Sequence, residues 1–138
     1  MFRVFNPSAS YQTVNDTPVT ILTYDGSMSD FFSSGINNWQ KWNIEIIAHD
    51  SIFDGYSGNM ASWRFEFSGK ADLGELIIDT YPLVPAYYES DGGASTWDAD
   101  VSITGSYLLF NVTGAADRSI IWDLYGQVVH VSDEAEPT

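Results

Sequence analysis

The sequence predicts an all-β protein: an antiparallel β-sandwich of about eight strands with jelly-roll-like topology. The first reason is that apolar and polar residues alternate with a period of two in several separate segments, which is the pattern of a half-buried strand. The second is that Gly, Asn, Asp and Ser gather between those segments, as they do in the turns of a sandwich. At 138 residues and 44% hydrophobic content, the chain is expected to form one domain with a sizeable core.

The chain begins with a segment that we interpret as an extended arm, residues 1–17. It is interrupted by Asn6-Pro7 and by the run from Asn15 to Pro18, and such sequences favour turns and irregular chain. The sandwich domain is then expected over residues 18–131. Residues 132–138 are acidic and terminal, which predicts a disordered tail.

The strands expected in the first two thirds of the chain share one pattern, in which every second residue is apolar. In residues 62–67, for example, Trp63 is expected to point inward and Arg64 outward, where Arg64 can form a cross-strand ion pair. Residues 25–38 are rich in Ser, Asn and Gly and are expected to form a long loop. The expected strands of this part are residues 11–14, 18–24, 42–49, 62–67 and 75–84.

The last third of the chain has the clearest alternation. Apolar residues recur at every second position from Trp97 to Ile103, and Gly105-Ser106 then forms a turn. Two more alternating runs follow, residues 108–114 and 120–131, which predicts a three-strand antiparallel meander. We expect four tryptophans in the core, namely Trp42, Trp63, Trp97 and Trp122.

This last pattern resembles the C-terminal β domain of tailed-bacteriophage virion proteins, which occurs in tail fibres and in head-surface proteins. The family theme is a Trp-led alternating strand, a small turn, a strand that ends in Gly, and a closing strand around a Trp. The chain departs from the theme at Leu124-Tyr125-Gly126, where a small residue and then a Val would be expected. The matching residues are Trp97, Val101, Leu108, Phe110, Val112, Gly114, Ile120, Trp122, Val129 and Val131.

The resemblance implies a virion protein. Small size, the initial Met1 and acidity lead us to expect a structural protein that is made in the host cytoplasm and sits on the outer capsid surface of a tailed phage. There it would decorate or cement the shell by binding the major capsid protein. The alternative is a tail-fibre or receptor-binding subunit that recognises host surface carbohydrate. A closed homotrimer is expected, because an open sandwich leaves edge strands that need cover.

Charge and composition exclude several classes of partner. The formal net charge is −14, and the five Lys and Arg residues are scattered, which argues against binding of nucleic-acid phosphates. The chain has no Cys, so that disulfides and thiolate metal sites are excluded. No apolar run approaches the roughly 20 residues that a membrane span requires, and we expect no membrane partner.

Catalysis and metal binding have weak candidates. Asp98 and Asp100 are expected on the outer face of one strand, and Asp123 can approach them from another, as acid–base chemistry or a calcium site would require. A solvated face is the better interpretation in a chain with 19 acids. His49 and His130 lack the spacing of metal ligands. We therefore expect no enzyme, no cofactor and no bound metal.

Aromatic side chains outside the alternating pattern indicate an interface. They include Trp39 and Tyr56, and both sugar-binding sites and protein interfaces use such residues. Subunit contacts are the favoured interpretation, because two adjacent rings cannot both face one shallow sugar site. The candidate interface residues are those of the arm, Phe2, Arg3, Val4 and Phe5, and the aromatic pairs Phe31, Phe32, Tyr87 and Tyr88.

Overall fold

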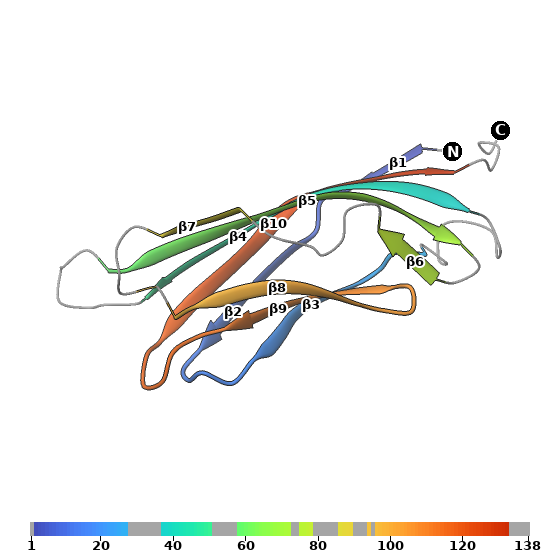
Figure 1. Ribbon diagram of the computed structural model, residues 1–138. Coiled ribbons are helices and arrows are strands. Elements are labelled where there is room, and N and C mark those ends of the chain that lie inside the picture. Colours follow the sequence, from blue (N-terminus) through green and yellow to red (C-terminus); the bar gives the residue numbers. More distant parts are fainter. Residues whose placement is uncertain are drawn as a thin grey trace.

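The computed structural model describes residues 2–27, 37–50, 58–72, 75–78, 86–89, 94 and 96–132. These residues form ten strands in two antiparallel sheets that lie face to face (Figure 1). The predicted all-β sandwich is therefore confirmed. The strands are β1 (Phe2–Phe5), β2 (Ser8–Thr13), β3 (Val19–Asp25), β4 (Asn38–Asp50), β5 (Met60–Asp72), β6 (Glu75–Ile78), β7 (Ala86–Glu89), β8 (Asp98–Thr104), β9 (Tyr107–Thr113) and β10 (Ile120–Ser132).

The larger sheet is built around three strands of 13 residues each, in the order β10, β4, β5. Each edge of this sheet is formed by two short strands that share one long neighbour. On one edge, β2 pairs with the first half of β10 and β1 with its last residues. On the other edge, β7 and β6 pair with successive parts of β5. The larger sheet is thus five strands wide wherever both edges are occupied.

The smaller sheet has the order β3–β9–β8 and covers the inner face of the larger one (Figure 1). Gly105, with a φ of +62°, opens the tight turn between β8 and β9. The chain crosses between the sheets from β2 to β3 and again from β9 to β10, and β2 pairs with β10 as β3 pairs with β9. The strands β2, β3, β9 and β10 are therefore arranged as in a jelly roll. In contrast, β4–β5 and β8–β9 are hairpins that each lie within one sheet.

The predicted three-strand meander over residues 96–131 is wrong at its third strand. The β8–β9 hairpin forms as expected, but β9 pairs on its other side with β3, and β10 lies in the larger sheet between β4 and the short edge strands. The connection turns at Asp117, whose φ is +56°. Alternation shows that a segment is a strand, but it does not select the partner strand, and β10 matches β4 in length.

Residues 1–17, which the sequence analysis interprets as an extended arm, lie against the sandwich and are part of its larger sheet. They contain β1 and β2, and both pair with β10 of the same chain. The Phe5 ring lies edge-on to His130 with centroids 5.6 Å apart, and Thr13 is buried. At the other end of the chain, β10 continues to Ser132, and the rest of the predicted tail lies outside the described residues.

The core lies between the sheets and is rich in aromatic rings. Trp63 stacks on Trp122 with ring centroids 5.4 Å apart, and Trp42 stacks on Phe67 at 5.5 Å. All four tryptophans that the sequence places inside are at most 3% exposed. Buried hydrophobic side chains from both sheets complete the core, among them Ile44, Ile46, Phe65, Leu108, Phe110, Val112, Ile120, Leu124 and Val128.

Gly126 lies in the middle of β10, opposite Ile44 of β4. A Cβ atom at this position would lie 2.2 Å from the carbonyl oxygen of Asn43 and 2.8 Å from the Cα atom of Ile44. The two backbones approach too closely for any side chain at position 126. Of the three residues Leu124-Tyr125-Gly126, at which the chain departs from the pattern given above, the structure accounts for Gly126.

Two buried tryptophans offer a matched test of the contribution of one indole hydrogen bond. Trp122 Nε1 donates to Thr13 Oγ1 at 2.9 Å, whereas Trp97 Nε1 has no hydrogen-bond partner among the described residues. Substitution by Phe removes both indole nitrogens, but only at position 122 does it leave a buried hydroxyl without its donor. We expect Trp122→Phe to lower the free energy of unfolding by about 1 kcal/mol more than Trp97→Phe does. Urea denaturation measures both losses, and equal losses would contradict the assignment.

Candidate binding surface

One end of the outer face of the larger sheet carries a row of exposed apolar side chains. Along this row Phe2 pairs with Val131, Val131 with Trp39, Trp39 with Lys70 and Lys70 with Ile77. Residues directly opposite each other in antiparallel strands share one face of the sheet. The four apolar members of the row are between 44% and 58% exposed. The row therefore presents apolar surface across five neighbouring strands.

A second row lies two residues further along the strands and enlarges this surface. Val4 pairs with Val129, Val129 with Lys41 and Lys41 with Ser68. Val4 is 42% exposed and Val129 is half-buried. Neither row contains an acid. We call Phe2, Val4, Trp39, Ile77, Val129 and Val131 the apolar patch.

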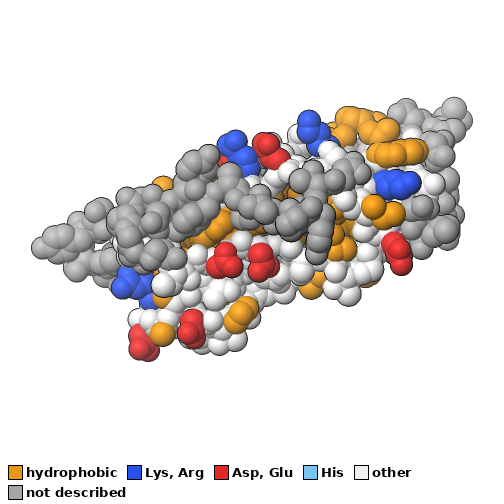
Figure 2. Space-filling view, in the orientation of Figure 1, with side chains coloured by type: hydrophobic (Ala, Val, Ile, Leu, Met, Phe, Trp, Pro, Cys, Tyr) orange, Lys and Arg blue, Asp and Glu red, His pale blue; other side chains and the backbone are white. Residues whose placement is uncertain are grey.

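Figure 2 shows hydrophobic and basic side chains together near the strand ends that carry β1 and the end of β10. The two rows also contain two lysines, Lys41 and Lys70. A contiguous exposed apolar patch with a polar rim is typical of a surface that binds another molecule. The apolar patch is therefore the candidate binding surface.

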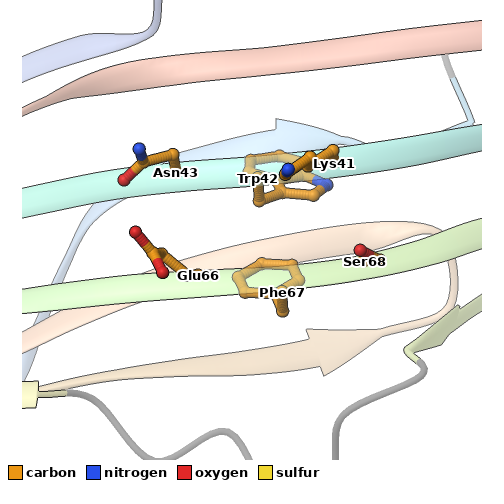
Figure 3. A pocket seen from close by; sticks show the side chains of 6 residues that line it. All are labelled: Lys41, Trp42, Asn43, Glu66, Phe67 and Ser68. Atoms are coloured by element: carbon orange, nitrogen blue, oxygen red, sulfur yellow. The ribbon is translucent and has the colours of Figure 1, made fainter.

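A shallow pocket of about 310 Å³ adjoins the apolar patch on β4 and β5 (Figure 3). Exposed Lys41, Asn43, Glu66 and Ser68 stand around it, and the buried pair of Trp42 and Phe67 lies between them. The charges of the one lysine and the one glutamate cancel. The pocket therefore adds hydrogen-bonding groups to the edge of the apolar patch.

Beneath the apolar patch, the inner positions of the same strand ends are polar and buried. His130 Nδ1 lies 2.9 Å from Asn38 Oδ1, and its Nε2 lies 3.2 Å from the hydroxyl of Tyr24 on β3. Gln40 Nε2 donates to Asn38 Oδ1 at 2.8 Å, and Gln40 Oε1 accepts from Trp42 Nε1 at 2.9 Å. These five side chains form a buried polar network that joins the two sheets.

The network holds the strands that display the apolar patch. Asn38 and Gln40 flank Trp39 along β4, and His130 lies between Val129 and Val131 along β10. The usual pattern is thus inverted at this end, with polar side chains inside and apolar ones outside. A slip of one residue in the β4–β10 pairing would bury the apolar side chains and expose the network. The hydrogen bonds therefore support the register that keeps the patch on the surface.

Burial sets the protonation state of the network. It lowers the pKa of His130 from 6.5 to about 4, and the charge of Asp25 opposes this effect in part. Burial also raises the pKa of Tyr24, with a smaller effect of Asp25 in the same direction. Both groups are therefore neutral at pH 7. A neutral imidazole that donates from Nδ1 and accepts at Nε2 fits the two partners of His130.

The structure brings only some of the predicted interface residues together. Phe2 and Val4 belong to the apolar patch, whereas Phe5 faces His130 and Arg3 is exposed between the two patch residues of β1. Phe31 and Phe32 lie outside the described residues, as does Tyr56. Tyr87 and Tyr88 lie in β7 and pair with Trp63 and Ser62.

The sequence analysis did not identify five residues of the two rows as interface residues, namely Ile77, Val129, Val131, Lys41 and Lys70. Part of this surface could have been predicted from the rule that successive side chains of a strand point to opposite faces of the sheet. Trp39 and Trp42 are three residues apart in one strand, so they must face opposite sides of the sheet. Since Trp42 is in the core, Trp39 has to be outside, and it is the one tryptophan of the five that is exposed.

The acids that were candidates for catalysis or calcium binding do not converge. Asp98 and Asp100 lie exposed on β8, whereas Asp123 lies on β10 in the other sheet, between the inward-facing Trp122 and Leu124. His49 is exposed and His130 is buried in the network. Among the residues that the structure describes, no group of three His, Cys, Asp or Glu side chains could hold a metal ion. The same part of the chain contains no helix that could span a bilayer.

Comparison with known proteins gives likeness of fold. No family model and no curated protein matches the chain. The tailspike protein of Acinetobacter baumannii phage AM24 matches 96% of this chain with a TM-score of 0.53 at 8% sequence identity. The tailspike protein of Acinetobacter phage vB_ApiP_P1 matches 89% of the chain with a TM-score of 0.43 at 10% identity. The chain spans only 27% and 21% of the lengths of these two proteins.

The buried His130 predicts a pH dependence of stability. Between pH 6.5 and about 4 the unfolded chain binds a proton that the native His130 does not bind, so its contribution to stability is full above pH 6.5 and falls as the pH falls through this window. A lowering of the pKa from 6.5 to about 4 corresponds to about 3 kcal/mol. We expect His130→Gln to lack this part of the acid destabilisation.

Urea denaturation of the native protein and of His130→Gln at pH 7, 6, 5 and 4 measures the effect. Titrating carboxyl groups are common to both proteins, so the difference between their free energies of unfolding isolates the histidine. A difference that stays constant over this pH range would refute the prediction.

Proposed function

We propose that this chain is a structural module of a phage tail, a part of a tail spike or tail fibre that builds or attaches the assembly and does not catalyse a reaction. The observation that carries the proposal is the likeness of nearly the whole chain to about a quarter of a tailspike protein. A sandwich that recurs as one part of a longer tail protein is suited to a connecting or attaching role. The apolar patch supplies the surface that such a role requires.

The tail is a better-supported location than the capsid surface. The capsid-decoration interpretation rested on small size, acidity and the start of the chain, whereas the solved structure that matches 96% of the chain with a TM-score of 0.53 is a tailspike protein. The expected arm that would tie neighbouring capsid subunits together is engaged with β10 of its own chain. These two observations favour the tail-fibre alternative of the sequence analysis.

A binding role is supported by what the acidic and aromatic side chains do. Asp50 pairs with Arg118 at 2.7 Å, Glu45 pairs with Arg64 at 2.9 Å, and Asp100 accepts a hydrogen bond from Asn111. These acids are used in structural contacts. The exposed ring of Trp39, in contrast, lies within a continuous apolar surface, as an interface anchor does.

The location can be tested on purified particles of the phage that encodes the chain. Quantitative mass spectrometry gives the number of copies per particle, and electron microscopy with a gold-labelled antibody gives their position. We expect a few to a few tens of copies, with label at the tail. Hundreds of copies with label over the head would establish the capsid-decoration function instead, and absence from the particles would refute both.

A further inference from the structure

The strand β1 is a short edge strand that buries little side-chain surface. It has four residues, and within the described part of the chain it pairs with the end of β10 alone. The first three residues of β1 are exposed, and only Phe5 is half-buried. Pro7, which lies at the break between β1 and β2, has no backbone N–H with which to continue the pairing. Segments with few buried contacts open locally at a small cost in free energy while the rest of the protein stays folded.

This strand covers the buried imidazole of His130. The Phe5 ring lies edge-on to the imidazole with centroids 5.6 Å apart, and the Tyr24 ring stacks on it from β3 at 6.0 Å. His130 has an exposed fraction of 0% with β1 in place. Detachment of β1 removes the Phe5 ring and opens the edge of β10 beside His130 to water.

Arg3 of β1 lies directly opposite His130 in the pairing with β10. Residues directly opposite each other in antiparallel strands share one face, and their Cα atoms are about 4.5–5.5 Å apart. A neutral imidazole tolerates the guanidinium at this position. A protonated imidazole would be a second cation there, and like charges directly opposite each other destabilise a strand pair. The repulsion acts between β1 and β10, so it weakens the attachment of β1.

We propose that β1 is a strap that acid releases: protonation of His130 detaches β1 from β10 while the rest of the sandwich stays folded. Detachment removes Phe2 and Val4 from the apolar patch, and it frees the edge of β10 from Val128 to Val131. Acid thereby changes the candidate binding surface. The effect on attachment rests on the proposed function of the patch, whereas the detachment itself does not.

The other groups around His130 determine how strongly a proton favours release. Within the described part of the chain, Tyr24 and Asp25 act on it from β3, and β4 contributes the neutral Asn38 and Gln40. Burial holds the pKa of His130 at about 4, and the charge of Asp25 opposes this effect in part. Exposure returns the pKa toward 6.5, so the detached state binds a proton more tightly than the attached state does. Release therefore increases as the pH falls from 6.5 to about 4.

Amide hydrogen exchange followed by NMR at pH 7 and pH 5 tests the proposal on the isolated chain. Exchange rates corrected for their intrinsic pH dependence give the opening of each strand separately. We expect the opening of β1 to increase by about threefold to twentyfold between pH 7 and pH 5, and a full return of the pKa to 6.5 sets the upper value. The amides of β5, in the middle of the larger sheet, are expected to keep their protection.

Variants at two positions separate the imidazole from its neighbouring cation. His130→Gln has no titrating group in this pH range and should lose the increase. Arg3→Gln removes the opposing cation, so we expect its increase to be at least about twofold smaller than that of the native chain. Arg3→Lys keeps the cation and should behave as the native chain does. Arg3 is exposed, so both of its variants are expected to fold normally even if His130→Gln does not.

Three results would overturn the proposal. The opening of β1 could be the same at pH 7 and pH 5. The strands β1 and β5 could lose protection together, which would show that acid unfolds the whole domain and releases no strap. Arg3→Gln could open as strongly as the native chain at pH 5. None of these results depends on where the chain is found in a phage particle, so the tail function and the strap can fail separately.

Discussion

The pairing of β10 with β4 over 13 successive residues is the constraint on which the rest of the structure depends. It places Ile120, Trp122, Leu124 and Val128 on the inner face, where they pack against the smaller sheet. Because side chains alternate between faces, a slip of one residue would exchange the core with the surface along the strand that slips. The edge strands on that side depend on the same register, since β1 and β2 pair only with β10. The close approach at Gly126 leaves this pairing no room for a side chain at its centre.

The same register creates the candidate binding surface. At the last residues of β10 and the first of β4, polar side chains lie inside and apolar ones outside, which inverts the pattern of the rest of the sheet. Buried polar groups are costly unless they are hydrogen-bonded, and here His130, Asn38 and Gln40 all have partners. A core filled with apolar residues at this end would tolerate a shifted register more easily. The polar network thus favours the one arrangement that leaves Trp39 exposed.

The sequence predicted the strands better than their partners. Period-two alternation identified the segments around β3, β4, β5, β8, β9 and β10, and the β8–β9 hairpin followed from Gly105-Ser106. Pairing between distant segments depends on which strands match in length and face, and local alternation contains no information about this. For that reason β10 was placed beside β9, and residues 1–17 were taken as an arm although they supply two edge strands. The patch was found only in part, at Phe2, Val4 and Trp39, because it combines residues from five strands.

The two outer faces of the sandwich have different chemistry. One face has exposed Val, Phe, Ile and Trp side chains with lysines beside them, and the other has Asp, Thr and Ser side chains with a ladder of hydrogen bonds from Thr20 through Asn111 to Asp100. Exposed apolar side chains gain free energy when a partner removes them from water, whereas polar side chains that already hydrogen-bond one another gain little. Of the two outer faces, the one that carries the apolar patch is therefore better suited to binding another molecule.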